Sequence, residues 1–199
     1  MTQIDKLTYL FSRFPGIGPR AAKRYVYFLL TQPKSFHIEL ANLLSDLGNN
    51  SATCADCQRF FASDGDFEVC TICGDKSRTT DIIMVVEKDV DLDNIERSGI
   101  YNGKYFVLGG TVPILEKSPD PKIRSEKLLS YLEKNSFKEI ILAMSATPDG
   151  DNTGDYLKKL LRKLKTKVKI SMLGRGLSTG SELEYSDSET IKSAFESRG

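Results

Sequence analysis

The sequence has no long apolar run, a single histidine and almost no net charge, and each absence excludes a class of protein. No apolar stretch reaches the roughly 18 residues that a membrane-spanning helix needs, so we expect no membrane segment. The first residues, Met1 to Asp5, contain no basic stretch followed by an apolar one, so no secretory signal is expected. These features predict a cytoplasmic protein.

Two further absences limit the chemistry. The sequence contains no Gly-x-x-x-x-Gly-Lys-[Ser/Thr] loop, so intrinsic ATP hydrolysis is not expected. We interpret the one histidine, His37, as a surface or packing residue rather than a general base. The net charge of +1 does not indicate a globally basic nucleic-acid binder, although basic residues cluster between Arg13 and Arg24.

No cysteine is left over from two C-x-x-C pairs, which are separated by twelve residues. Such a set predicts a C4-type zinc finger over residues 54–73 that holds one structural Zn²⁺ per chain. Its ligands would be Cys54, Cys57, Cys70 and Cys73. Asp64-Gly65-Asp66 in the insert predicts a hairpin turn between two short strands, as in a zinc ribbon.

Two other roles for these cysteines are disfavoured. Two disulfides would suit a secreted chain, and a redox C-x-x-C would need only one pair in a thioredoxin-like context. Catalysis at the metal is also disfavoured, because four thiolates leave no open coordination position.

Residues 1–53 are predicted to form three helices that make up a DNA-binding region. The first contains Ile4 to Phe11, the second begins near Pro19, and Ser35 is a candidate cap for the third, which Gly48 would end.

The break between the first two helices, Phe14-Pro-Gly-Ile-Gly-Pro19, has the pattern of a helix-hairpin-helix. Its glycines permit a tight turn, and the backbone N–H groups beside it can bind a phosphate oxygen without reading bases. The candidate DNA-binding residues are Gly16, Gly18, Arg20, Lys23 and Arg24. This pattern predicts sequence-independent contacts with single- and double-stranded DNA. The alternative is a plain helical corner with solvated arginines.

From residue 80 to about 175 the pattern changes to short apolar runs alternating with helical segments. The four candidate strands are Ile82–Val86, Tyr105–Leu108, Glu139–Ala143 and Val168–Met172. Helices are predicted over about 92–98, 120–135 and 153–165. This alternation predicts a mostly parallel α/β sheet. The tail, 176–199, is expected to hold a loop and a helix starting near Asp187 or Ser188, and we interpret the glycine-rich stretch 174–180 as a packing or interface loop.

Three carboxylates are predicted to meet at one edge of this sheet. Glu87 ends the first strand, and Asp149 and Asp151 lie in the loop expected after the third. Carboxylates in such a crevice could hold Mg²⁺, and this arrangement resembles the Toprim fold of topoisomerases, DnaG-type primases and some nucleases. The alternative is three solvated loop acids.

The order of these parts resembles the RecR family of bacterial recombination mediators. The resemblance rests on the Pro-Gly-Ile-Gly-Pro hairpin, the four cysteines, Val85-Val-Glu87, the run from Tyr105 to Gly110 and the run from Gly174 to Tyr185. It implies a non-catalytic, nucleoid-associated repair protein that forms a ring-like dimer or tetramer around DNA. It also implies cooperation with RecO and RecF in loading RecA onto single-stranded DNA.

The resemblance also suggests roles for residues. Arg20 and Arg24 match the family's DNA-binding positions, zinc would be structural, and the Toprim acids would bind a partner protein rather than catalyse. The chain departs from the family in having Asp149-Gly-Asp151 where Glu-Gly-Glu is usual, and in the segment from Thr111 to Asp120. Two other classes stay open: a metal-dependent Toprim nuclease or strand-transfer enzyme, and a zinc-ribbon adaptor that binds only protein.

Overall fold

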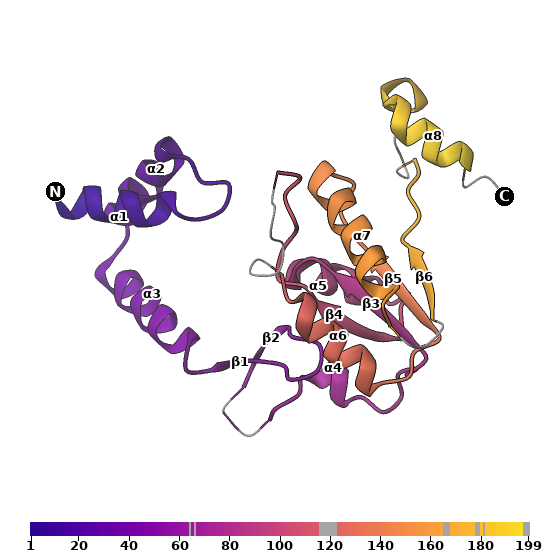
Figure 1. Cartoon of the computed structure of the whole chain (residues 1–199). Coiled ribbons are helices and arrows are strands. Elements are labelled where there is room, and N and C mark those ends of the chain that lie inside the picture. Colours follow the sequence, from indigo (N-terminus) through magenta and orange to yellow (C-terminus); the bar gives the residue numbers. More distant parts are fainter. Residues whose placement is uncertain are drawn as a thin grey trace. The chain divides into compact units, whose positions relative to one another are not determined.

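The computed structural model describes residues 1–63, 65, 67–115, 123–164, 168–177, 180 and 182–196. The chain forms two compact units, Met1–Ser51 and Ala52–Gly199 (Figure 1). Within the described residues, no helix has both the length and the apolar character needed to cross a membrane.

The first unit consists of helices α1 (Gln3–Ser12), α2 (Pro19–Leu30) and α3 (Lys34–Leu47). Reciprocal hydrogen bonds between Thr2 and Asp5 cap α1, and these bonds from Thr2 lower the pKa of the Asp5 carboxyl. Pro19 begins α2, where its missing N–H costs nothing. The sequence therefore predicted the first two helices and the break between them correctly.

The start of α3 differs from the prediction. Ser35 lies inside the first turn, and Pro33, with an extended backbone, is the residue before the helix. The fixed φ of proline is compatible with the N-cap position, so Pro33 occupies that position and Ser35 does not cap the helix. The exposed His37 donates from its ring Nε2 to the carbonyl of Leu29, at the end of α2, over 2.7 Å.

The second unit is built on a four-stranded parallel sheet with the strand order β4-β3-β5-β6 (Figure 1). The strands are β3 (Ile82–Val86), β4 (Lys104–Val107), β5 (Glu139–Ala143) and β6 (Lys169–Met172). This confirms the predicted parallel α/β architecture. Each candidate strand identified from its apolar run forms, with bounds that differ by at most one residue.

The two faces of the sheet are buried by different parts of the chain, because side chains alternate along each strand. Ile83 and Val85 face one core, which also contains apolar residues of α6 (Ser125–Lys134) and α7 (Pro148–Leu161). Met84 and Val86 face the other, which contains Leu92 of α5 (Asp89–Ser98) and three of the cysteines. The cysteine segment therefore covers one face of the sheet.

Helices α5 and α7 start earlier than predicted. Thr147 caps α7 by accepting the backbone N–H of Gly150 at 3.1 Å, and Pro148 occupies its first turn. The apolar periodicity of this helix begins only at Tyr156, so the pattern missed its polar first turns. Asp149 and Asp151 consequently lie in the first turn of α7 and not in a loop, which corrects the prediction.

The strands of the cysteine segment also differ from the prediction. Strands β1 (Ser51–Thr53) and β2 (Phe60–Ala62) pair with each other around the first C-x-x-C, and α4 (Thr71–Gly74) contains the last cysteine. Asp64 and Asp66 of the expected turn lie outside the described residues, and 67–69 form no strand. The chain turns back earlier because Gln58 adopts a positive φ of 62°.

The tail contains a short 3-10 helix (Leu183–Tyr185) and α8 (Ser188–Glu196), which begins where the sequence predicted. The Asp187 carboxylate caps α8 by accepting the backbone N–H of Thr190 at 2.9 Å and its hydroxyl at 2.7 Å. Residues 178 and 179 of the glycine-rich loop lie outside the described part of the chain, so its assignment as an interface loop stays a prediction.

Candidate functional site

The four cysteines meet at one point. Their sulfur atoms all lie within 4.8 Å of one another, and the Sγ atoms of Cys57 and Cys70 are 3.6 Å apart. A tetrahedral Zn²⁺ with Zn–S bonds of about 2.3 Å would hold sulfurs about 3.8 Å apart, so this donor set fits zinc. None of the four is in a disulfide. Hydrogen bonds from Cys57, and then from Cys70 and Cys73, lower the pKa of Cys54, whereas the hydrogen bonds with Cys54 raise the pKa of Cys57 and of Cys73. Metal binding requires all four sulfurs to be deprotonated, so it would release protons from this cluster.

The segment around the first cysteine pair is attached to the edge of the sheet. The Cys57 carbonyl accepts the N–H of Val107 on β4 at 2.8 Å. Gln58 donates from its side-chain amide to the Cys54 carbonyl at 3.1 Å and accepts from the ammonium of Lys127 at 2.8 Å. The guanidinium of Arg124 donates to the Gln58 carbonyl at 2.8 Å. These bonds connect the metal-binding segment to β4 and to the start of α6.

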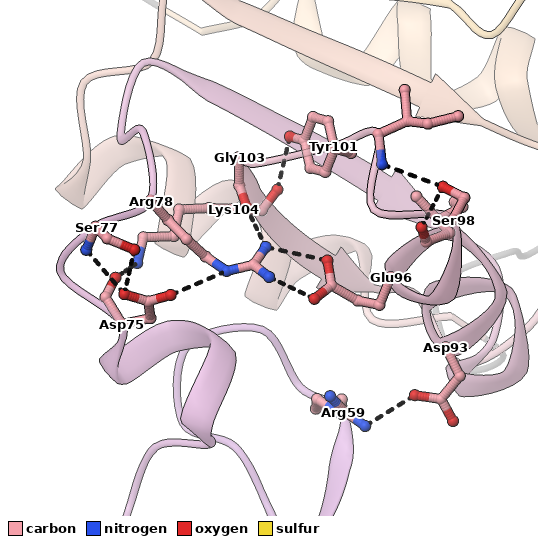
Figure 2. Close-up of polar contacts among 12 residues, drawn as sticks. Arg59, Asp75, Ser77, Arg78, Asp93, Glu96, Ser98, Tyr101, Gly103 and Lys104 are labelled. Atoms are coloured by element: carbon pink, nitrogen blue, oxygen red, sulfur yellow. Dashed lines mark hydrogen bonds and ion pairs between the residues drawn. The ribbon is translucent and has the colours of Figure 1, made fainter.

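Helix α5 connects to the same segment through its acidic residues (Figure 2). Asp93 pairs with Arg59 at 2.9 Å, and Asp89, three residues after the end of β3, accepts the backbone N–H of Phe60 at 2.7 Å. Glu96 binds both terminal nitrogens of Arg78, whose guanidinium also donates to the carbonyl of Gly103. This network was not predicted from the sequence. Its only sequence signal is the spacing of the three acids, which lie at i, i+4 and i+7 on one helical face.

The first of the predicted Toprim acids is buried. Glu87 follows β3 with 3% of its surface exposed, and its carboxylate accepts the backbone N–H of Ser145 at 2.7 Å and the hydroxyl at 2.8 Å. Gly150 packs closely against this pair, because a Cβ there would lie 2.1 Å from the Ser145 carbonyl oxygen and 3.1 Å from a Glu87 oxygen. Sequence reasoning missed Ser145 as the partner of Glu87.

The two aspartates also have protein partners. Asp149 accepts the backbone N–H of Ile114 at 3.2 Å, and Asp151 binds Arg175 through both terminal guanidinium nitrogens. Across the described residues, the cysteines are the only group of three or more acidic, cysteine or histidine ligand atoms close enough to share a metal ion. Mg²⁺ binding by the acids therefore stays a prediction, and it would require these partners to be displaced.

The divergent segment from Thr111 to Asp120 is described as far as residue 115. Val112 donates its N–H to the Thr153 hydroxyl at 2.8 Å, and its carbonyl accepts the side-chain amide of Asn152 at 3.0 Å. Residues 116–120 of this divergent segment lie outside the described part of the chain. The described part of the segment therefore packs on α7.

The candidate DNA-binding residues lie together in the first unit. Gly16 has a φ of +75° in the turn after α1, and Gly18, in extended conformation, precedes α2 without offering a side-chain cap. Because the N-cap residue of α2 is a glycine, no N-cap side chain accepts a hydrogen bond from the first-turn N–H groups of this helix. The side chains of Arg20, Lys23 and Arg24 are all exposed on the same helix. The structure thus brings the glycine turn and the three predicted cations into one region.

Comparison with known proteins identifies three parts of the chain. A model described as "RecR, helix-hairpin-helix" matches residues 4–47, one described as "Toprim domain" matches 81–173, and one described as "RecR, C-terminal" matches 176–198. Proteins named "Recombination protein RecR" are similar over nearly the whole chain. The one from Ruegeria pomeroyi is 35% identical over 98% of this chain and 95% of its own length. The one from Dehalococcoides mccartyi is 35% identical over 98% of this chain and 93% of its own length.

Proposed function

This chain belongs to the RecR family of recombination proteins, and on that premise we propose that it is a DNA-binding mediator of recombination and repair without catalytic activity of its own. The observation that carries this proposal is the exposed group of Arg20, Lys23 and Arg24 beside the glycine turn. Cations and backbone N–H groups in this arrangement suit phosphate oxygens, which every DNA sequence presents. The proposed ligand is therefore single- or double-stranded DNA bound without sequence preference.

In this proposal the protein acts with RecO- and RecF-type partners to load RecA onto single-stranded DNA. Family membership and the acidic end of α7 support it. Asp151 keeps 46% of its side chain exposed, so a basic surface of a partner could reach it. The Toprim acids would then contact protein rather than perform chemistry.

The proposal includes assembly into a dimer or tetramer that can form a ring around DNA. An apolar groove of about 740 Å³ lies between the helices of the first unit, and Leu43, Leu44 and Leu47 on α3 each have more than 60% of their surface exposed. An exposed apolar surface of this kind is typical of a protein interface. Zn²⁺, one per chain, would keep the cysteine segment folded against the sheet.

The alternative is a metal-dependent Toprim nuclease or strand-transfer enzyme. The buried Glu87 supports the non-enzymatic proposal, because both of its oxygens are engaged by Ser145. Incubating the zinc-loaded protein with Mg²⁺ or Mn²⁺ and labelled DNA tests this directly. We expect no cleavage. Cleavage that disappears in Asp149→Asn would show that the acids are catalytic and would overturn the proposal.

The DNA-binding part is tested by replacing Arg20 and Arg24 with alanine. Affinity for all sequences should fall, and the slope of log K against log salt should flatten by about 2, because two phosphate contacts are lost. The double variant Lys6→Ala, Lys34→Ala is a matched control, since it removes the same charge from exposed positions of α1 and α3. An unchanged salt slope in the arginine variant would contradict the assignment.

A further inference from the structure

Tyr27 shares one face of α2 with the candidate DNA-binding cations. Residues 20, 23, 24 and 27 follow helical spacing, so their side chains lie on the same side, opposite the buried Ala22 and Val26. Half of the surface of Tyr27 is exposed, and the ammonium of Lys23 lies 5.9 Å from the centre of its ring. The exposed face of α2 thus carries an aromatic ring within a row of positive charges.

The contacts of Tyr27 differ from those of the other aromatic residues of α2. Tyr25 packs edge-on against Phe11, and Phe28 packs edge-on against Phe36, so both rings hold helices of the first unit together. Tyr27 makes no ring–ring contact among the described residues; its aromatic contact is with Lys23. The Tyr27 ring is therefore available to contact an external ligand. The neighbouring cations favour a ligand that is negatively charged.

We propose that Tyr27 stacks on an unpaired nucleobase, while Arg20, Lys23 and Arg24 bind the adjacent phosphates. This inference rests on the proposed DNA-binding function and adds to it a contact that only single-stranded DNA can make, while duplex binding stays with the three cations. Bases stack readily on exposed aromatic rings when the strand is unpaired, and stacking does not depend on sequence. In a duplex the bases already stack on each other and only the backbone reaches this face, so Tyr27 contributes little there.

Affinity measurements on the full-length, zinc-loaded protein separate the two kinds of contact. Fluorescence anisotropy with a labelled oligothymidine and with a duplex of equal length is the assay. Tyr27→Ala should weaken single-strand binding on the order of tenfold. Duplex binding should change less than about twofold. Tyr27→Phe keeps the ring and should bind both ligands like the parent protein. Thermal melting of each variant establishes that it is folded.

The absence of tryptophan from the sequence provides a second readout. Tyr27→Trp places a single indole on this face, and stacking on a base should quench its emission. We expect quenching by the single strand and not by the duplex. Tyr185→Trp is the matched control, because Tyr185 is 80% exposed in the second unit and should report no stacking.

The outcomes distinguish this inference from the function on which it rests. If the Arg20→Ala, Arg24→Ala variant binds DNA normally, the proposed DNA-binding surface is wrong. If that variant loses affinity but Tyr27→Ala affects both ligands equally, or neither, stacking is wrong while DNA binding stands. Loss of oligomer mass in light scattering of Tyr27→Ala would place the ring in a protein interface and would also overturn the inference.

Discussion

The backbone N–H of Val107 donates to the carbonyl of Cys57 at 2.8 Å, so the edge strand of the sheet pairs with the metal-binding segment. An edge strand left open would expose unpaired backbone groups to other chains. Cys57 and Val107 also share one apolar core. The cysteine segment is therefore part of the second unit's fold, and the metal is expected to stabilise the whole of that unit.

Removing a metal ligand should destabilise the second unit as a whole. We expect Cys70→Ser to lose zinc and several kcal/mol of folding free energy, because structural zinc binding is coupled to folding. Each kcal/mol corresponds to about 2–4 °C in Tm for a chain of this size. Calorimetry and zinc analysis on the same samples are the measurements. Thr71→Ser, at the exposed neighbouring position, should leave both unchanged. A folded, reduced parent protein without zinc would exclude the metal assignment.

The ion pair of Arg78 and Glu96 is expected to be important for stability because it is largely shielded from water. Figure 2 shows the two guanidinium–carboxylate contacts of this pair. Only 11% of the Arg78 side chain and 22% of the Glu96 side chain are exposed. Arg78→Ala leaves Glu96 without its ion-pair partner and should lower the free energy of unfolding by about 3–5 kcal/mol, measured by urea denaturation. Glu96→Ala should cost less, because Arg78 keeps its longer pair with Asp75 at 3.7 Å. The matched control is Lys138→Ala, because the pair of Lys138 with Asp81 is 79% and 47% exposed and should contribute less than about 1 kcal/mol. Equal effects at the two pairs would contradict this reasoning.

Gly150→Ala should be destabilising although alanine favours helices. In an exposed helix this change would stabilise by about 1 kcal/mol. Here the added Cβ would lie 2.1 Å from the backbone oxygen of Ser145, so the start of α7 must shift, at a cost of about 1–3 kcal/mol.

Gly154→Ala is the control for this prediction in the same helix. Its Cβ would meet the flexible end of Met172 at 3.3 Å, which can move aside. Chemical denaturation of the two variants should therefore give clearly different free energies of unfolding. If Gly150→Ala is as stable as Gly154→Ala, the close packing around Glu87 is not rigid.

The sequence predicted the parts of the molecule whose signals are local. The spacing of Cys54, Cys57, Cys70 and Cys73 identified the metal group, and each apolar run identified a strand. It did not predict the contacts that depend on the tertiary structure. Glu87 was recognised as a strand-end acid, but its partner, Ser145, is brought to it only by the pairing of β3 with β5. The turn after Cys57 was missed because a glutamine rarely adopts positive φ.

The polar starts of helices were a second source of error. Asp149 and Asp151 were expected in a loop because no apolar residue marks the first turn of α7. Carboxylates are favourable in a first turn, where they face the positive end of the helix dipole. Capping residues and the helix dipole therefore determine where a helix with a polar first turn begins. Apolar periodicity predicts only the later turns of such a helix.

The pairing of Arg175 with Asp151 should limit access to the proposed partner surface. The pair joins the segment after β6 to the first turn of α7, with 30% and 46% of the side chains exposed, so its loss should cost less than about 1 kcal/mol in stability. If a RecO- or RecF-type partner binds Asp151 through a basic side chain, that side chain must compete with Arg175. Arg175→Ala should therefore tighten partner binding, and Asp151→Asn should weaken it. Titration calorimetry with each purified partner measures both effects.

Lys158→Ala is the control for net charge, because it removes a charge from the exposed pair with Asp155 on the same helix. Equal tightening by Lys158→Ala would mean that overall charge, and not release of Asp151, governs the interaction.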